Sequence, residues 1–181
     1  MTTALLFLDV DGPLIPFGAS SGPYPTYPPL PPPSVSPLLA RLDPAQGPRL
    51  AALPYELVWA TTWEEDANTW VAPRLGLPAL PLLPWSDDPE EPGLHWKTPA
   101  LVAWAAGRPF AWVDDEIGAA DRAWVAAHHP GPALLHRVDA RRGLTAADFE
   151  ALAAWAVGSP CHADRDRDQD RHGEGEGDDG G

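Results

Sequence analysis

Acidic side chains follow two of the most apolar segments of this chain. Asp9 and Asp11 come at the end of ALLFLDVD, and Asp114 and Asp115 come directly after PFAWV. Carboxylates packed together repel one another and therefore need a cation. Hard oxygen ligands favour Mg²⁺, which also binds phosphate groups of substrates. A cluster of these acids would therefore bind a cation, and Mg²⁺ is the expected cofactor.

The same residues, with two others, suit phosphate chemistry. A carboxylate such as Asp9 can attack phosphorus and form an acyl phosphate. A second acid such as Asp11 can protonate the leaving oxygen and later take a proton from water. Lys97, the only lysine of the chain, and the hydroxyl of Thr61 can hold phosphoryl oxygens. The candidate catalytic residues are thus Asp9, Asp11, Thr61 and Lys97, with Thr62 as the alternative to Thr61.

Alternating apolar segments predict the elements that must bring these residues together. The predicted strands are 4–9, 55–61, 79–83, 109–113 and 133–138, and the predicted helices are 34–42, 64–75, 98–106, 118–128 and 146–157. This alternation indicates an α/β fold, a Rossmann-like three-layer α/β/α sandwich with a mostly parallel five-stranded sheet. Ligands of such sheets gather at the carboxyl ends of the strands, where the candidate residues lie.

Composition divides the chain into one domain and a tail. Residues 1–157 have the apolar content of a single folded domain, whereas residues 158–181 are acidic and rich in Gly and Asp, which predicts disorder. Residues 13–54 hold thirteen of the 24 prolines, so residues 13–33 should form an irregular loop or small flap. No interval has room for a sizeable cap domain.

Four motifs in order resemble the haloacid dehalogenase superfamily of hydrolases. They are LFLDVDGPL, the apolar stretch VWAT, Lys97 before a helix, and the acidic pair in WVDDE. The resemblance implies that Asp9 is the nucleophile and a metal ligand. It implies that Asp11 is the acid/base and lends its backbone carbonyl to the metal. It also implies the strand order 5-4-1-2-3.

The resemblance assigns the remaining site residues as well. Thr61 would bind a phosphoryl oxygen, Lys97 would steady Asp9 and the phosphate, and Asp114 would complete the Mg²⁺ shell with Asp115 close by. Apart from the resemblance, Gly12, Thr62 and Trp63 lie next to these residues in the sequence and are the expected substrate-binding residues. The chain departs from the family at Pro13, where Thr or Val is usual, and this puts the geometry of the loop after Asp11 in question.

A narrower resemblance concerns the possible substrate. The stretches WATTWEEDAN and HWKTPALVAWA look like the capless dehalogenase-type domain of bacterial "Swiss Army Knife" RNA repair proteins. This implies a Mg²⁺-dependent phosphatase acting on a polynucleotide end or another large phosphorylated substrate. We expect Arg141 and Arg142 to lie in a solvated turn. The alternative is that they bind a second phosphate. Asp121 is predicted to lie at the surface.

Charge and hydropathy exclude several other classes. The net charge of −14 argues against an extended nucleic-acid surface. No segment approaches the length of a membrane helix, and the apolar start is too short for a signal peptide, so we expect a cytoplasmic monomer. The alternatives are a catalytically silent binding or regulatory module, a phosphate-receiver domain, and another reaction of the same superfamily.

Overall fold

The sheet of this protein contains four parallel strands. The computed structural model describes residues 3–19, 22–32, 34–84 and 93–158. The strands are β1 (Ala4–Leu8), β2 (Tyr55–Trp59), β3 (Phe110–Asp114) and β4 (Ala133–Arg137), in the order β2-β1-β3-β4. Leu6 of β1 is opposite Leu57 of β2 and Ala111 of β3. The predicted α/β class with a parallel sheet is confirmed.

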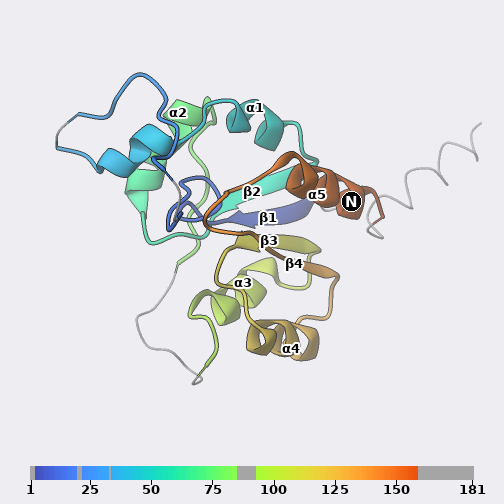
Figure 1. Ribbon diagram of the computed structural model, residues 1–181. Coiled ribbons are helices and arrows are strands. Elements are labelled where there is room, and N and C mark those ends of the chain that lie inside the picture. The colour runs from blue at the N-terminus through green and yellow to red at the C-terminus, as the bar shows by residue number, and fades with distance from the viewer. Residues whose placement is uncertain (1–2, 20–21, 33, 85–92, 159–181) are drawn as a thin grey trace, which may run out of the picture.

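Helices cover both faces of the sheet. The helices α3 (Lys97–Ala105) and α4 (Ala119–His128) lie on one face, and α1 (Gln46–Ala51) and α5 (Ala146–Gly158) lie on the other (Figure 1). Side chains of β1 alternate between two separate apolar cores, with Leu6 and Leu8 in one and Leu5 and Phe7 in the other. All five residues of β1 are buried, as expected for a strand covered on both faces. This arrangement is compatible with the predicted Rossmann-like sandwich.

The prediction of a fifth strand at 79–83 is wrong. Only a single parallel bridge, between Trp59 and Leu82, remains beside β2. The Trp59 amide donates to the Pro81 carbonyl, and the Leu83 amide donates to the Trp59 carbonyl. Prolines at 78, 81 and 84 lack the N–H groups that a longer ladder needs, so pairing stops there. The four strands that do form keep the predicted order.

A side chain replaces the missing strand as the partner of this segment. The Asn68 amide donates to the Leu80 carbonyl at 3.0 Å and accepts from the Leu80 amide at 2.9 Å. The same Asn68 oxygen accepts from the indole N–H of fully buried Trp59 at 3.0 Å. One side chain thus satisfies three polar groups at the sheet edge, which would otherwise be unpaired away from water.

The helices between β1 and the Lys97 segment differ most from the prediction. The predicted helix 34–42 is a 3₁₀ helix over Pro37–Arg41, capped by Ser36. The predicted helix 64–75 is a π-helix over Ala67–Val71 followed by α2 (Ala72–Leu75) and Gly76. Pro73 cannot donate to the preceding turn, and its ring collides with a regular α-helical carbonyl, so the helix widens before it.

Helix α1 was not predicted, because its sequence, QGPRLA, contains two residues that disfavour helices. Gly47 has a packing role there: a Cβ at this position would lie 1.7 Å from the Leu75 carbonyl oxygen of α2. The close approach of the two short helices therefore requires glycine. Close packing between helices leaves no signal in the local hydrophobic pattern.

The second half of the chain follows the prediction more closely. Helix α3 begins at Lys97 rather than Thr98, and Trp96, not Thr98, occupies its N-cap position. The ends of α4, β4 and α5 agree with the predicted elements within one residue. Most of the predicted loop 84–93 and nearly all of the tail 158–181 lie outside the described residues. Within the described ranges, no helix is both long enough and apolar enough to span a membrane.

Asn68→Ala should destabilise the protein. The substitution leaves the Trp59 indole and both backbone groups of Leu80 without their partner, at a cost of about 2–4 kcal/mol. Thr69→Ala, in an exposed position of the same π-helix, should change the free energy of unfolding by less than about 0.5 kcal/mol. Chemical unfolding of the two variants measures both effects, and equal stabilities would contradict the assigned role of Asn68.

Candidate functional site

The candidate site lies at the carboxyl edge of the sheet. Asp9 follows β1, Thr61 follows β2 and Asp114 is the last residue of β3. In the sheet, β2 lies on one side of β1 and β3 lies on the other, so the chain changes direction after β2. In open parallel sheets this change of direction leaves a crevice beside the central strand. The predicted convergence of Asp9 and Asp114 therefore has a topological cause.

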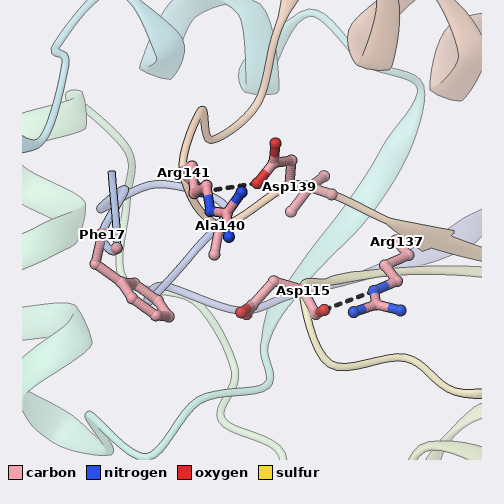
Figure 2. A pocket seen from close by; sticks show the side chains of 8 residues that line it. Phe17, Asp115, Arg137, Asp139, Ala140 and Arg141 are labelled. Atoms are coloured by element: carbon pink, nitrogen blue, oxygen red, sulfur yellow. Dashed lines mark hydrogen bonds between the residues drawn. The ribbon is translucent and has the colours of Figure 1, made fainter. Parts of the chain in front are cut away.

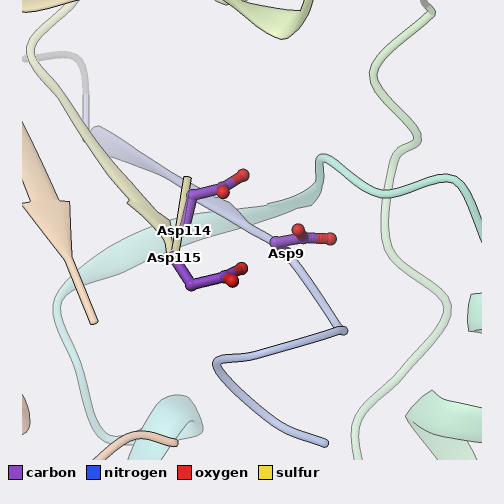
Figure 3. Close-up of side chains that lie close together, drawn as sticks. All are labelled: Asp9, Asp114 and Asp115. Carbon is purple, nitrogen blue, oxygen red and sulfur yellow. The ribbon is translucent and has the colours of Figure 1, made fainter. Parts of the chain in front are cut away.

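Three carboxylates form a compact cluster at this edge. Oxygens of Asp9, Asp114 and Asp115 all lie within 4.8 Å of one another. Figure 3 shows the three side chains pointing in the same direction from the ends of β1 and β3. Asp9 and Asp114 are buried, and Asp115 is partly exposed, so the cluster can be reached from one side.

Lys97 joins the two strands. Its Nζ lies 2.8 Å from Oδ2 of Asp9 and 2.7 Å from Oδ2 of Asp114, and the residue is 2% exposed. Burial disfavours the ammonium, but the two carboxylates outweigh burial and raise the pKa of Lys97 above its ordinary value. The lysine is therefore charged and holds both acids from the first residue of α3.

The single ammonium does not neutralise the cluster. Burial is the largest cause that raises the pKa of Asp9 to about 7, while Lys97 lowers it and Asp114 raises it. Burial and the neighbouring Asp114 also raise the pKa of Asp115. Three acids and one lysine leave an excess of negative charge at this edge of the sheet. Three carboxylates whose oxygens lie within 4.8 Å of one another fit a hard divalent cation such as Mg²⁺, which prefers oxygen ligands.

Backbone and indole groups fix the two buried acids. The Val10 amide donates to Oδ1 of Asp9 at 2.7 Å. The Glu116 amide donates to Oδ1 of Asp114 at 2.9 Å, and the Trp112 indole donates to Oδ2 of Asp114 at 3.2 Å. The Oδ2 atoms of Asp9 and Asp114 both contact the Lys97 ammonium. The orientation of both carboxylates is therefore set before any ligand binds.

Asp11 occupies a different position from the cluster. Its Oδ2 accepts a hydrogen bond from the Trp63 indole at 2.9 Å, and its side chain is not among the three that converge. Trp63, predicted as a substrate-binding residue, is placed to orient Asp11. The turn after Asp11 closes although it contains Pro13, because the Gly12 amide donates to Ile15 and the Pro13 carbonyl accepts from Leu144.

Gly12 is held by a close approach to the cluster. Its φ is +85°, and a Cβ at this position would lie 2.5 Å from Oδ1 of Asp115. Both observations explain why glycine follows the two acids here. Gly12, predicted to bind substrate, thus makes room for the Asp115 carboxylate.

The two threonines after β2 lie in different surroundings. Thr61 is 3% exposed, and its hydroxyl accepts from the Trp63 amide at 3.4 Å, whereas Thr62 is exposed. Thr61 lies at the same edge of the sheet as Asp9. No described contact joins Thr62 to the carboxylate cluster.

The prediction that Asp121 lies at the surface is wrong. It is 2% exposed and accepts hydrogen bonds from the His95 amide, the Thr98 hydroxyl and the Gly118 amide at 2.7–2.8 Å. It therefore ties the segment that carries Lys97 to the start of α4. An acid three residues after Gly118, at a helix start, is the sequence signal that could have indicated a capping role.

His95 supports the lysine from the preceding loop. Its Nδ1 accepts from the Lys97 amide at 3.2 Å, and its Nε2 lies 3.4 Å from a Glu116 carboxylate oxygen. Burial lowers the pKa of His95, although the nearby Asp114 opposes this effect. A neutral ring with its proton on Nε2 is consistent with both contacts.

Comparison of the chain with protein families, with curated proteins and with solved structures finds no match. The case for a function therefore depends on the residues and geometry described above.

The raised pKa of Asp9 should make the metal-free protein less stable as pH rises from about 4 to about 7. The folded state keeps a proton that the unfolded chain, with an Asp pKa of 3.8, releases. Asp9→Asn removes this loss, so its stability relative to wild type should increase by about 2 kcal/mol between pH 5 and pH 7.

Chemical unfolding in the presence of a chelator measures this difference. Asp66→Asn, at an exposed position, is the matched control and should show the same difference from wild type at both pH values. A stability difference between Asp9→Asn and wild type that does not change with pH would contradict the raised pKa of Asp9.

Proposed function

We propose that this protein is a Mg²⁺-dependent phosphohydrolase of the haloacid dehalogenase type. The observation that carries the proposal is the contact of Lys97 Nζ with both Asp9 and Asp114, beside a third acid, Asp115. The motif order in the sequence supports the same assignment. The buried ammonium of Lys97 would offset negative charge on a bound phosphate, and the two acids beside it would offset the positive charge of the cation.

The donor set suits the cation that this chemistry needs. Asp9, Asp114 and Asp115 would hold Mg²⁺ through their side chains, and the backbone carbonyl of Asp11 is the fourth expected ligand. Bound Mg²⁺ would offset the charge of the phosphoryl oxygens. The side chain of Asp11, which lies outside the cluster, remains available for proton transfer.

Hydrolysis would proceed in two displacements on phosphorus. In the first, an Asp9 oxygen forms a bond to phosphorus while the ester bond breaks, and the leaving oxygen takes a proton from Asp11. In the second, a water oxygen attacks phosphorus, gives a proton to Asp11 and releases the Asp9 carboxylate with inorganic phosphate. Both acids return to their starting states.

The other two catalytic candidates would act on charge and position. Lys97 would hold Asp9 in place for attack and contribute a positive charge beside the transferred group. The Thr61 hydroxyl would bind a phosphoryl oxygen from the neighbouring strand end. Trp63 would orient Asp11 through the indole hydrogen bond, and we describe it as a positioning residue.

The surroundings of the site favour a large substrate. The described residues between β1 and β2, and between β2 and α3, form only short helices and loops, with nothing the size of a cap domain. An open site suits a phosphate at the end of a larger molecule, such as a polynucleotide end. The net charge of −14 makes contact along an extended nucleic acid unfavourable, so a short terminal segment is the better fit.

The protein should hydrolyse an aryl phosphate in the presence of Mg²⁺ and lose this activity on chelation. Asp9→Asn should abolish turnover because the nucleophile is lost, and Asp11→Asn should lower kcat by about 100-fold or more while the fold is retained. Glu150→Gln, an exposed acid of α5, is the control.

Release of the aryl alcohol, with circular dichroism of each variant, measures both effects. Activity that survives chelation and the Asp9→Asn substitution would refute the proposed reaction.

Trp63→Phe should lower kcat by about 10-fold, because Asp11 loses a hydrogen bond that orients it. If Trp63 acts through Asp11, adding Trp63→Phe to Asp11→Asn should cause no further loss of kcat. Steady-state kinetics of the two single variants and the double variant give this comparison. Multiplicative losses in the double variant would show that Trp63 does not act through Asp11.

A further inference from the structure

A pocket adjoins the carboxylate cluster on the side of the loop after β4. Its volume is about 610 Å³, within the range of small-molecule sites. The lining includes Phe17, Asp115, Arg137, Asp139 and Arg141 (Figure 2). Asp115 belongs both to this lining and to the cluster with Asp9 and Asp114. A phosphate at the cluster would therefore have the rest of its molecule next to this pocket.

The walls of the pocket are held together by backbone hydrogen bonds. The Phe17 amide donates to the Ala140 carbonyl at 2.8 Å, and the Leu144 amide donates to the Pro13 carbonyl at 2.8 Å. The Arg41 side chain also donates to the Pro16 carbonyl at 3.1 Å. The segment that carries Phe17 is thus fixed against the loop that carries Arg141. A preformed site of this kind loses less entropy on binding.

The lining offers an aromatic ring and two cations. Phe17 is 42% exposed, and its segment is fixed by backbone contacts. The Arg137 Nε donates to the backbone carbonyl of Asp115 at 2.8 Å, which fixes its guanidinium against the loop after β3. No hydrogen bond or ion pair joins the Arg141 guanidinium to another residue in the described part of the chain. Asp139 accepts from the Arg141 backbone amide and so holds the turn.

These features match a particular leaving group. An exposed ring stacks with a nucleobase, and a guanidinium binds a phosphate through paired hydrogen bonds. A sugar phosphate would leave Phe17 without a partner, and a simple aryl group would leave Arg141 without one. The lining also holds two acids, Asp115 and Asp139, which offset the two arginines. A second phosphate is therefore favoured only where it contacts the Arg141 guanidinium directly.

We propose that this pocket binds the nucleoside part of a substrate that carries a second phosphate, with the base on Phe17 and the second phosphate on Arg141. The substrate class is then a nucleoside bisphosphate or the terminal nucleotide of a phosphorylated strand. The inference rests on the proposed function, because the first phosphate must occupy the carboxylate cluster.

Specificity measurements on matched arginine variants test the second phosphate. Wild type should have a higher kcat/KM for a nucleoside 3′,5′-bisphosphate than for a nucleoside monophosphate. Arg141→Gln should reduce this ratio by about 10-fold, and Arg142→Gln, an exposed neighbour outside the pocket lining, should leave it unchanged. A ratio that changes in neither variant, or equally in both, overturns the proposal.

The role of the ring is tested by the same comparison with a different substrate pair. Phe17→Leu keeps an apolar side chain but removes stacking, so the preference for a nucleoside monophosphate over ribose 5-phosphate should fall by about 10-fold. An unchanged preference overturns the assignment of Phe17. A wild-type preference for a phosphotyrosine peptide over every nucleotide would overturn the substrate class.

A binding measurement separates this inference from the catalytic proposal. Calorimetric titration with a nucleoside 3′,5′-bisphosphate in Mg²⁺ uses the Asp11→Asn protein, which keeps all three carboxylates of the cluster and should turn substrate over only slowly. Binding that Arg141→Gln weakens by about 10-fold, and Arg142→Gln does not weaken, supports the pocket even if wild type proves inactive. Absence of binding, or equal binding by both arginine variants, overturns the inference even if wild type hydrolyses aryl phosphates.

Discussion

The buried ion pairs of Lys97 with Asp9 and Asp114 are the contacts on which the site depends. Removing three charged groups from water is costly, and only close mutual contact compensates for the cost. The contacts at 2.7–2.8 Å require the first residue of α3 to reach the ends of both β1 and β3. The site therefore exists only when these three elements are packed in their native positions. Asp115 adds a charge that the lysine cannot balance, and the proposed Mg²⁺ would balance it.

The fold supplies this geometry through a few supporting contacts. A central strand buried on both faces places Asp9 in the crevice between its neighbours. Asp121 and His95 hold the Lys97 segment against the start of α4 and the loop after β3. Gly12 allows the chain after Asp9 to pass close to Asp115. None of these supports is a carboxylate of the cluster, yet each constrains where the carboxylates lie.

Sequence patterns predicted that Asp9 and Asp114 lie close together, but they did not predict the elements around these acids as well. Acids at the ends of apolar strands must meet at one edge of a parallel sheet, so Asp9 and Asp114 could be placed together from their positions alone. The strand at 79–83 failed because its prolines remove donors. Helix α1 was missed because it depends on the contact of Gly47 with α2. The indole contact of Trp63 and the burial of Asp121 depend on side-chain directions in three dimensions, which periodicity does not specify.

Direct observation of the cation would test the central claim that Asp9, Asp114 and Asp115 share one divalent ion. Mn²⁺ uses the same oxygen ligands as Mg²⁺ and is detected by electron paramagnetic resonance. In a titration, wild type and Glu150→Gln should bind Mn²⁺ with the same affinity. Asp114→Asn should bind Mn²⁺ about 10-fold or more weakly than wild type. Equal Mn²⁺ binding by wild type and Asp114→Asn would contradict the account.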